Sequence, residues 1–137
     1  MDNKLTVRVI GVKEFSRAIE RNPRKVKDEL AKFFIRAKSE YNQTMMRNPW
    51  QVGGSGGGAP VDTGALRDSH QSGTKIRPFK MTFGPDERIA SYAGYVHEGT
   101  NRMKARPWLN YTFDKKERKV RDLADDMLQT IVKDLSR

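Results

Sequence analysis

The sequence predicts an α+β fold in which two long helices pack on a small, mostly antiparallel sheet, accompanied by a flexible glycine-rich loop. Apolar residues recur at helical spacing over residues 26–45 and again over 120–135, which predicts two long amphipathic helices. Apolar and polar residues alternate over 5–9 and roughly over 76–83, which predicts strands. The run Gly-Gly-Ser-Gly-Gly-Gly at 53–58 predicts the loop.

The first element is a half-buried strand over residues 4–10. Leu5, Val7 and Val9 fall on one face of an extended chain, and polar side chains fall on the other. Apolar residues at helical spacing then predict a short helix over 12–20.

The first long helix has clear start and stop signals. Asn22 is a good N-cap residue and Pro23 suits the first helical position. We expect the helix to run to Arg47, because Asn48 precedes Pro49 and proline disfavours helix at the residue before it. Its charged face mixes both signs, which favours a solvated surface over a nucleic-acid groove. Its apolar stripe is Val26, Leu30, Phe33, Phe34, Ala37, Tyr41 and Met45.

The glycine-rich segment at 51–59 is predicted to be a mobile loop that becomes ordered only in an assembly. It is not a phosphate cradle, because no Gly-Lys-Ser/Thr follows it.

The middle of the chain predicts short elements. Asp62 can cap a helical turn over 63–68. Two antiparallel strands are expected over 69–78 and 79–84, ending at the turn residues Gly-Pro-Asp. A third strand or a short helix covers 89–96.

The last element is a second long helix that starts near Pro107 or Trp108 and runs to Leu135. Its stripe is Val120, Leu123, Ala124, Met127, Leu128, Ile131, Val132 and Leu135. A basic cluster lies early in this helix, either as a solvated turn or as a contact with an acidic neighbour or DNA. The cluster is Lys115, Lys116, Arg118, Lys119 and Arg121.

Length and composition indicate a single domain over residues 1–137 with its flexible loop at 51–59. No apolar run approaches the length needed to span a bilayer, the first residues lack the core of a signal peptide, and there is no cysteine. We therefore expect synthesis in the cytoplasm and no membrane partner. The net charge of +10 predicts attraction to nucleic acid or to an acidic partner surface. The basic residues are spread over several segments rather than gathered into one recognition element.

No pattern of residues predicts catalysis, a metal site or a cofactor. His97-Glu98 lacks the second histidine that a zinc protease needs three residues after the glutamate, since residue 101 is Asn. His97 is therefore expected at the surface or at an interface. Ser69 beside His70 on a strand would point to the opposite face. We expect that the protein is not an enzyme.

Two segments have the composition of a docking element: Ala59–Arg67 and Tyr92–Trp108. Tyrosine, tryptophan and arginine dominate binding hot spots, and glycines allow close backbone approach. Glu98 and the arginines are expected to form polar pairs within or between subunits, whereas Tyr92, Val96 and Trp108 suit either an interface or a buried turn. The candidate interface residues are Asp62, Thr63, Gly64, Leu66, Arg67, Tyr92, Tyr95, Val96, Glu98, Gly99, Thr100, Arg102, Arg106, Pro107 and Trp108.

These segments resemble a family of bacteriophage proteins. The order Ala-Pro-Val-Asp-Thr-Gly-Ala-Leu-Arg, then Tyr-Ala-Gly-Tyr-Val-His-Glu-Gly-Thr, then Ala-Arg-Pro-Trp-Leu is similar to the neck and tail-completion proteins of long-tailed phages. The resemblance covers about half of the chain, from Ala59 to Leu109.

The resemblance implies a virion structural protein that forms a ring and helps to join the tail to the capsid. It implies a hexamer first and a dodecamer second, with neighbouring head–tail connector and tail-tube or tail-terminator proteins as partners and a non-specific contact with DNA. The alternative is a basic nucleic-acid-binding accessory protein.

Overall fold

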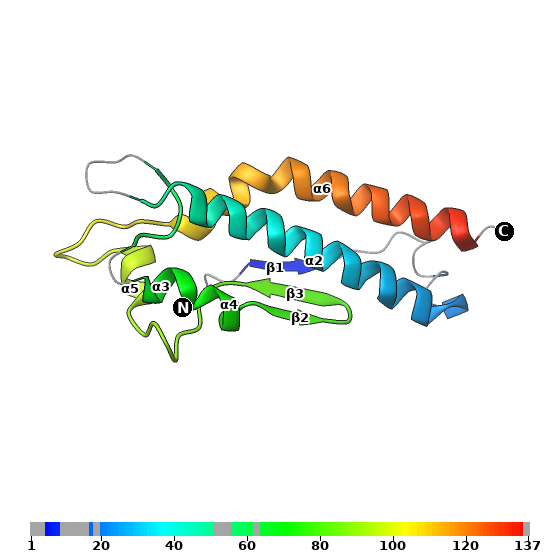
Figure 1. Cartoon of the computed structure of the whole chain (residues 1–137), viewed down its shortest axis with the longest axis horizontal. Coiled ribbons are helices and arrows are strands. Elements are labelled where there is room, and N and C mark those ends of the chain that lie inside the picture. Colours follow the sequence, from blue (N-terminus) through cyan, green and yellow to red (C-terminus); the bar gives the residue numbers. More distant parts are fainter. Residues whose placement is uncertain (1–4, 9–16, 18–19, 51–55, 62–63, 136–137) are drawn as a thin grey trace.

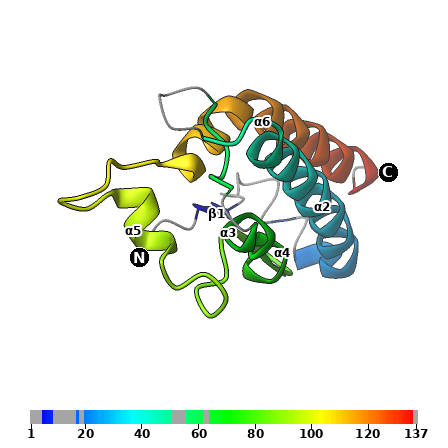
Figure 2. The same ribbon diagram turned by 60° about the vertical axis from the view of Figure 1, so that its left-hand side comes forward.

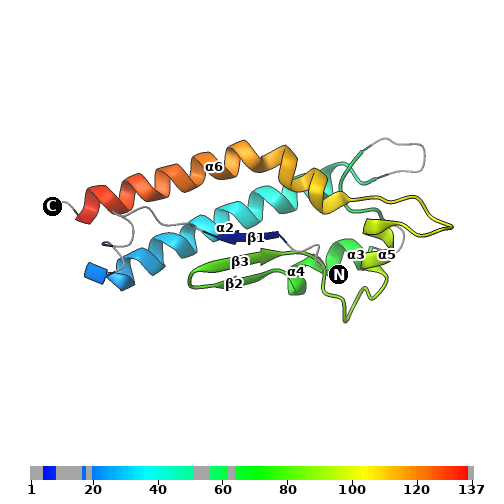
Figure 3. The ribbon, with the colours of Figure 1, turned by 180° about the vertical axis from the view of Figure 1, so that it is seen from behind.

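Figure 1 shows the computed structural model of the chain, which describes residues 5–8, 17, 20–50, 56–61 and 64–135. Two long antiparallel helices lie along one face of a three-stranded sheet, and short helices gather at one end. The view from behind in Figure 3 shows the same two layers. The predicted α+β fold, with two long helices on a small antiparallel sheet, is confirmed.

Helix α2 spans Pro23–Arg47, with the start and the end that the sequence predicts. The Asn22 side chain accepts a hydrogen bond of 3.2 Å from the backbone N–H of Lys25, which satisfies a donor that the first helical turn leaves unpaired. The helix ends at Arg47, and Asn48 is its C-cap residue. Its buried residues are those of the predicted stripe: Val26, Leu30, Phe33, Phe34, Ala37, Tyr41 and Met45.

Helix α6 spans Trp108–Leu135 and packs along α2 in the opposite direction. Ion pairs join Lys25 to Asp134 at 3.3 Å and Glu40 to Lys116 at 3.0 Å, so the start of each helix lies beside the end of the other. The residues of the predicted apolar stripe of α6 are buried or half-buried from Val120 to Ile131, whereas Val132, near the end of the helix, is 42% exposed. The sheet is short, and α6 extends beyond it there (Figure 1).

The sheet consists of β1 (Leu5–Arg8), β2 (Lys75–Arg77) and β3 (Lys80–Phe83) in the order β1-β3-β2, with both pairings antiparallel. Met81 and Phe83 of β3 are fully buried beneath the long helices. The Phe83 ring lies 5.5 Å from that of Tyr41 in α2 and 6.0 Å from that of Phe113 in α6. These contacts fix the helical layer on one face of the sheet.

Three short helices connect the larger elements: α3 (Ala65–Asp68), α4 (His70–Gly73) and α5 (Ala93–Glu98). The strand predicted over 69–78 is therefore wrong in its first half, because residues 70–73 are helical and β2 begins only at Lys75. The segment over 89–96 contributes a short helix rather than a third strand. The predicted helix at 12–20 lies almost entirely outside the described residues.

The second half of the glycine-rich segment is packed, in contrast to the predicted mobile loop. The N–H groups of Gly57 and Gly58 donate to Asn48 O, and that of Ala59 donates to Met45 O, so the chain is attached to the end of α2. Gly57, Gly58 and Ala59 are all buried. A Cβ on Gly58 would clash with the Met45 carbonyl oxygen, so glycine is required by close approach rather than by mobility. Residues 51–55 lie outside the described part of the chain.

Candidate interaction surface

The two sequence motifs meet at one end of the molecule, where α2 ends and α6 begins. Figure 2 brings this end forward and shows α3, α5 and the start of α6 around it. The indole Nε1 of Trp108 donates a hydrogen bond of 3.0 Å to His70 Nε2, which joins the second motif to the helical turns that follow the first. Within the second motif, the Arg106 N–H donates to Val96 O at 3.0 Å, so the chain that leaves α5 returns alongside it.

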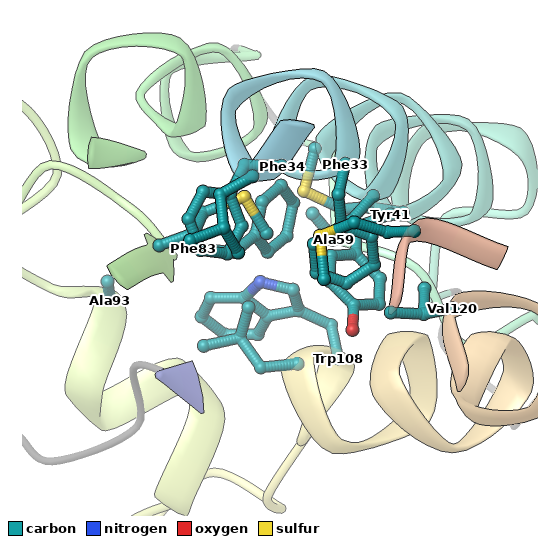
Figure 4. Close-up of a cluster of buried hydrophobic side chains, with 14 of the residues drawn as sticks. Phe33, Phe34, Tyr41, Ala59, Phe83, Ala93, Trp108 and Val120 are labelled. Carbon is teal, nitrogen blue, oxygen red and sulfur yellow. The ribbon is translucent and has the colours of Figure 1, made fainter. Parts of the chain in front are cut away.

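Trp108 is the central side chain of the core at this end (Figure 4). It is fully buried and packs against two imidazole rings. The His70 ring centroid lies 6.0 Å from that of Trp108, and the His97 centroid lies 4.9 Å from it in an edge-on arrangement. A fully buried indole has no surface left for a partner, so Trp108 acts as an anchor of the fold and not as an interface side chain.

His70 is held in one neutral tautomer. Its Nδ1 lies 3.0 Å from Leu66 O and 3.2 Å from Arg67 O; both are acceptors, so Nδ1 carries the proton. Its Nε2 must then be the acceptor for Trp108. Burial lowers the pKa of His70 from 6.5 to about 4, and the two backbone contacts offset part of that effect.

His97 is also buried, at 3% exposure, which corrects its expected place at the surface or at an interface. It is on the inner side of α5, where Ala93 and Val96 are buried as well. Its Nδ1 lies 3.1 Å from Glu98 Oε1, while the Glu98 carboxylate is largely exposed. The pattern around His97 does not indicate this burial, because charged and polar residues follow it.

Gly64 and Gly99 set the backbone of the two motifs. Gly64 has φ of +89° and precedes α3, and Gly99 has φ of +81° and ends α5. Both values lie in the left-handed region that glycine tolerates best. A Cβ on Gly99 would also lie 2.7 Å from the Ala105 nitrogen. The chain then turns at Thr100–Met103, closed by a 2.8 Å bond from Thr100 N to Met103 O.

The exposed candidates are tyrosines and charged residues around α5. Tyr95 is 65% exposed and Tyr92 43% exposed, and they lie three residues apart, which makes them neighbours on a helical surface. Glu98, Thr100 and Arg102 are exposed beside them in sequence. These side chains form the candidate interaction surface: Tyr92, Tyr95, Glu98, Thr100 and Arg102.

The other candidates support this surface from within. Leu66 and Val96 are buried in the core together with Trp108, and Arg106 and Pro107 are half-buried. Arg106 Nη2 lies 3.2 Å from Met103 Sδ. Of the remaining candidates, Arg67 Nε contacts Asp68 Oδ1 at 3.1 Å, and Asp62 and Thr63 lie outside the described residues.

A clamp that the sequence did not predict fixes the loop before α5. Asp86 accepts hydrogen bonds from Ser72 Oγ at 2.8 Å and from Arg88 Nε and Nη2 at 3.1 and 3.0 Å. The Asp86 N–H donates to Ser69 O, so the loop is joined to α4 at both backbone and side chain. The Arg88 and Ser72 contacts hold the pKa of Asp86 well below its usual range. The sequence signal for this clamp is that Asp86 directly follows Gly84-Pro85 and precedes Arg88 by two residues.

The described residues contain no cluster of His, Asp and Glu that could hold a metal ion, and no helix among them is long and apolar enough to cross a bilayer. The hydroxyl of Ser69, which is adjacent to His70 in the sequence, forms a hydrogen bond within the fold: its Oγ donates to Leu66 O at 2.7 Å. The geometry therefore defines an α+β domain with an exposed, tyrosine-bearing end. Searches against family models, curated proteins and solved structures gave no match to this chain. The resemblance to phage neck proteins stays a prediction from the sequence.

Proposed function

We propose that this protein is a structural component of a bacteriophage neck, where it forms a ring that helps to join the tail to the capsid. The observation that carries the proposal is the meeting of the two resembling motifs at one end of the molecule. Their buried members, Leu66, Val96 and Trp108, fix the backbone there. Their exposed members, Tyr92 and Tyr95 among them, are of the kind that protein interfaces use.

A ring of identical chains requires two different surfaces, because each copy contacts its neighbours head to tail. The candidate interaction surface supplies one of them. From the resemblance we expect a hexamer first and a dodecamer second, between head–tail connector proteins and tail-tube or tail-terminator proteins. The chain would be made in the host cytoplasm and incorporated into the virion.

The direct test is immunogold labelling of purified virions that encode this protein, viewed by negative-stain electron microscopy. Gold at the head–tail junction is the expected result. Gold elsewhere on the particle would overturn the neck position. No gold on virions, with the protein present in infected cells, would favour the alternative, a basic nucleic-acid-binding accessory protein.

A paired substitution tests the surface itself. Tyr95→Glu places a charge on the candidate interaction surface, and Val132→Glu places the same charge on an exposed apolar position at the opposite end of α6. Tyr95→Glu should reduce ring formation, measured by light scattering, and should reduce the yield of tailed particles. Equal effects of both variants, or no effect of Tyr95→Glu, would contradict this role.

A further inference from the structure

The outer face of the sheet carries an unusual concentration of positive charge. Strand pairing places Arg77 opposite Lys80 and Lys75 opposite Thr82. Successive side chains of a strand point to opposite faces, so these four residues share one face of the hairpin. The other face holds the buried Met81 and Phe83, which pack toward the long helices.

This face is exposed and has no acidic residue in its strands. Lys75, Arg77 and Lys80 are exposed, and Thr82 is half-buried. No Asp or Glu occurs between Asp68 and Asp86, so the hairpin has no anion of its own.

Several cations of the long helices have acidic partners, whereas no hairpin cation has one among the described residues. Lys25, Lys32, Lys116 and Arg121 each lie within 3.3 Å of a carboxylate oxygen. None of the three hairpin cations makes an ion pair with a described residue. Like charges directly opposite each other destabilise a sheet. The pairing of Arg77 with Lys80 therefore lowers the stability of the sheet, and a bound polyanion would offset this repulsion.

We propose that this outer sheet face, formed by Lys75, Arg77, Lys80 and Thr82, binds the phosphate backbone of double-stranded DNA. Lysine, arginine and threonine are the side chains that contact phosphates without reading sequence. Single-strand binding needs aromatic side chains on the face for base stacking. This face carries none, because Phe79 lies in the turn at its tip, where Lys27 Nζ is 5.8 Å from the ring centroid.

The DNA-binding face does not depend on the assembly role. It lies on the hairpin, while the candidate interaction surface lies on and after α5 at the end of the molecule (Figure 1). The protein can therefore bind DNA without forming rings, or form rings without binding DNA, and separate variants report on each.

The test is the salt dependence of binding to a fluorescein-labelled duplex of random sequence and about 30 base pairs, followed by anisotropy between about 50 and 200 mM NaCl. The variant Lys75→Gln/Arg77→Gln/Lys80→Gln removes the cations of the face. The matched control is Arg24→Gln/Arg36→Gln/Arg47→Gln, which removes exposed cations from α2. Both variants lower the net charge from +10 to +7.

We expect the face variant to bind roughly ten-fold or more weakly than the parent, with a log K against log salt slope shallower by about two to three units. The control should stay close to the parent. Circular dichroism verifies that both variants fold. Equal losses in both variants would make the binding a net-charge effect and overturn the proposal. Tighter binding to the single strand than to the duplex, or no binding by the parent at about 50 mM salt, would also overturn it.

Discussion

Trp108 Nε1 and His70 Nε2 lie 3.0 Å apart in the core, as donor and acceptor of a hydrogen bond between residues 38 positions apart in the chain. The bond joins the first turn of α6 to α4, and thereby joins the second motif to the chain that follows the first. It also requires a neutral His70. This buried polar contact is therefore one of the interactions that position the candidate interaction surface.

Replacing Trp108 with Phe should lower the free energy of unfolding by about 1–3 kcal/mol, because His70 Nε2 loses its donor in a buried place. Urea unfolding measures the change. Trp50→Phe is the control, since no described residue bonds the Trp50 indole N–H. A similar loss in both variants would show that the hydrogen bond contributes little beyond aromatic packing.

Stability should fall with acidification in the window that His70 sets. The folded pKa of His70 is about 4, below its ordinary value of 6.5, so the unfolded chain takes up the proton first. The stabilisation is complete above about pH 6.5 and is lost as the pH falls toward about 4, by up to roughly 3 kcal/mol. Urea unfolding at a series of pH values measures this. In His70→Gln, the loss of unfolding free energy between about pH 6.5 and 4 should be smaller than in the parent. An unchanged pH profile would show that His70 does not cause this loss.

Asp86 should produce a second, more acidic loss. Hydrogen bonds from Arg88 and Ser72 depress the pKa of Asp86, so its stabilisation is present above its ordinary value of 3.8 and is lost as the pH falls further. Asp86→Asn should flatten the stability profile below about pH 4 and leave the His70 window unchanged. Thermal melts between about pH 2 and 5 separate the contribution of Asp86 from that of His70. If Asp86→Asn instead changes the loss of stability that is ascribed to His70, Asp86 is not the source of the more acidic loss.

Gly58→Ala should destabilise the protein by about 1–3 kcal/mol, because the added methyl group meets the Met45 carbonyl oxygen in a packed turn. Gly64→Ala is a useful comparison. That position has φ of +89°, but the nearest atom to a Cβ there is the end of the Arg67 side chain at 3.4 Å. Gly64→Ala should therefore lower the free energy of unfolding only through the strained backbone, by about 1 kcal/mol. A mobile segment at 56–59 would tolerate Gly58→Ala without loss.

Lys80→Thr should raise stability slightly, by about 0.2–1 kcal/mol, while it weakens DNA binding. Threonine suits a strand and removes the like-charge pair with Arg77. Thermal melts at low and high salt measure the gain, which should diminish as salt screens the charges. If the gain does not depend on salt, strand propensity rather than repulsion explains it.

The long helices were predictable because their signals are local. Asn22-Pro23 at one end of α2 and Asn48-Pro49 at the other fix its limits, and a regular apolar stripe defines its buried face. The start of α6 at Trp108 follows in the same way from the proline before it. The buried face of β3 was also predictable from alternation, since Met81 and Phe83 are its buried positions.

The parts that the sequence could not reveal depend on contacts between distant segments. Alternation predicts a strand over 69–78, yet Leu66, Ser69 and His70 form helical turns through backbone and side-chain bonds that alternation does not show. The burial of His97 and Trp108 follows from the approach of α4 and α5 to the same place. The sequence left Trp108 open between an interface and a buried turn and predicted His97 at the surface or at an interface, and only the packing shows which tyrosines remain exposed.

The return of the chain at Trp50 and Gly58 has a practical consequence. The Trp50 N–H donates to Gly58 O at 3.0 Å, so the residues on either side of the segment 51–57 are held together at the end of α2. Doubling the length of a flexible segment between two fixed ends costs only about 0.6 kcal/mol in closure entropy. An epitope or fluorescent tag could therefore be inserted between these residues, at the end where α2 stops and α6 starts, while α5 and the sheet keep their native sequence. The domain thus carries a built-in attachment point for locating this end in a larger particle.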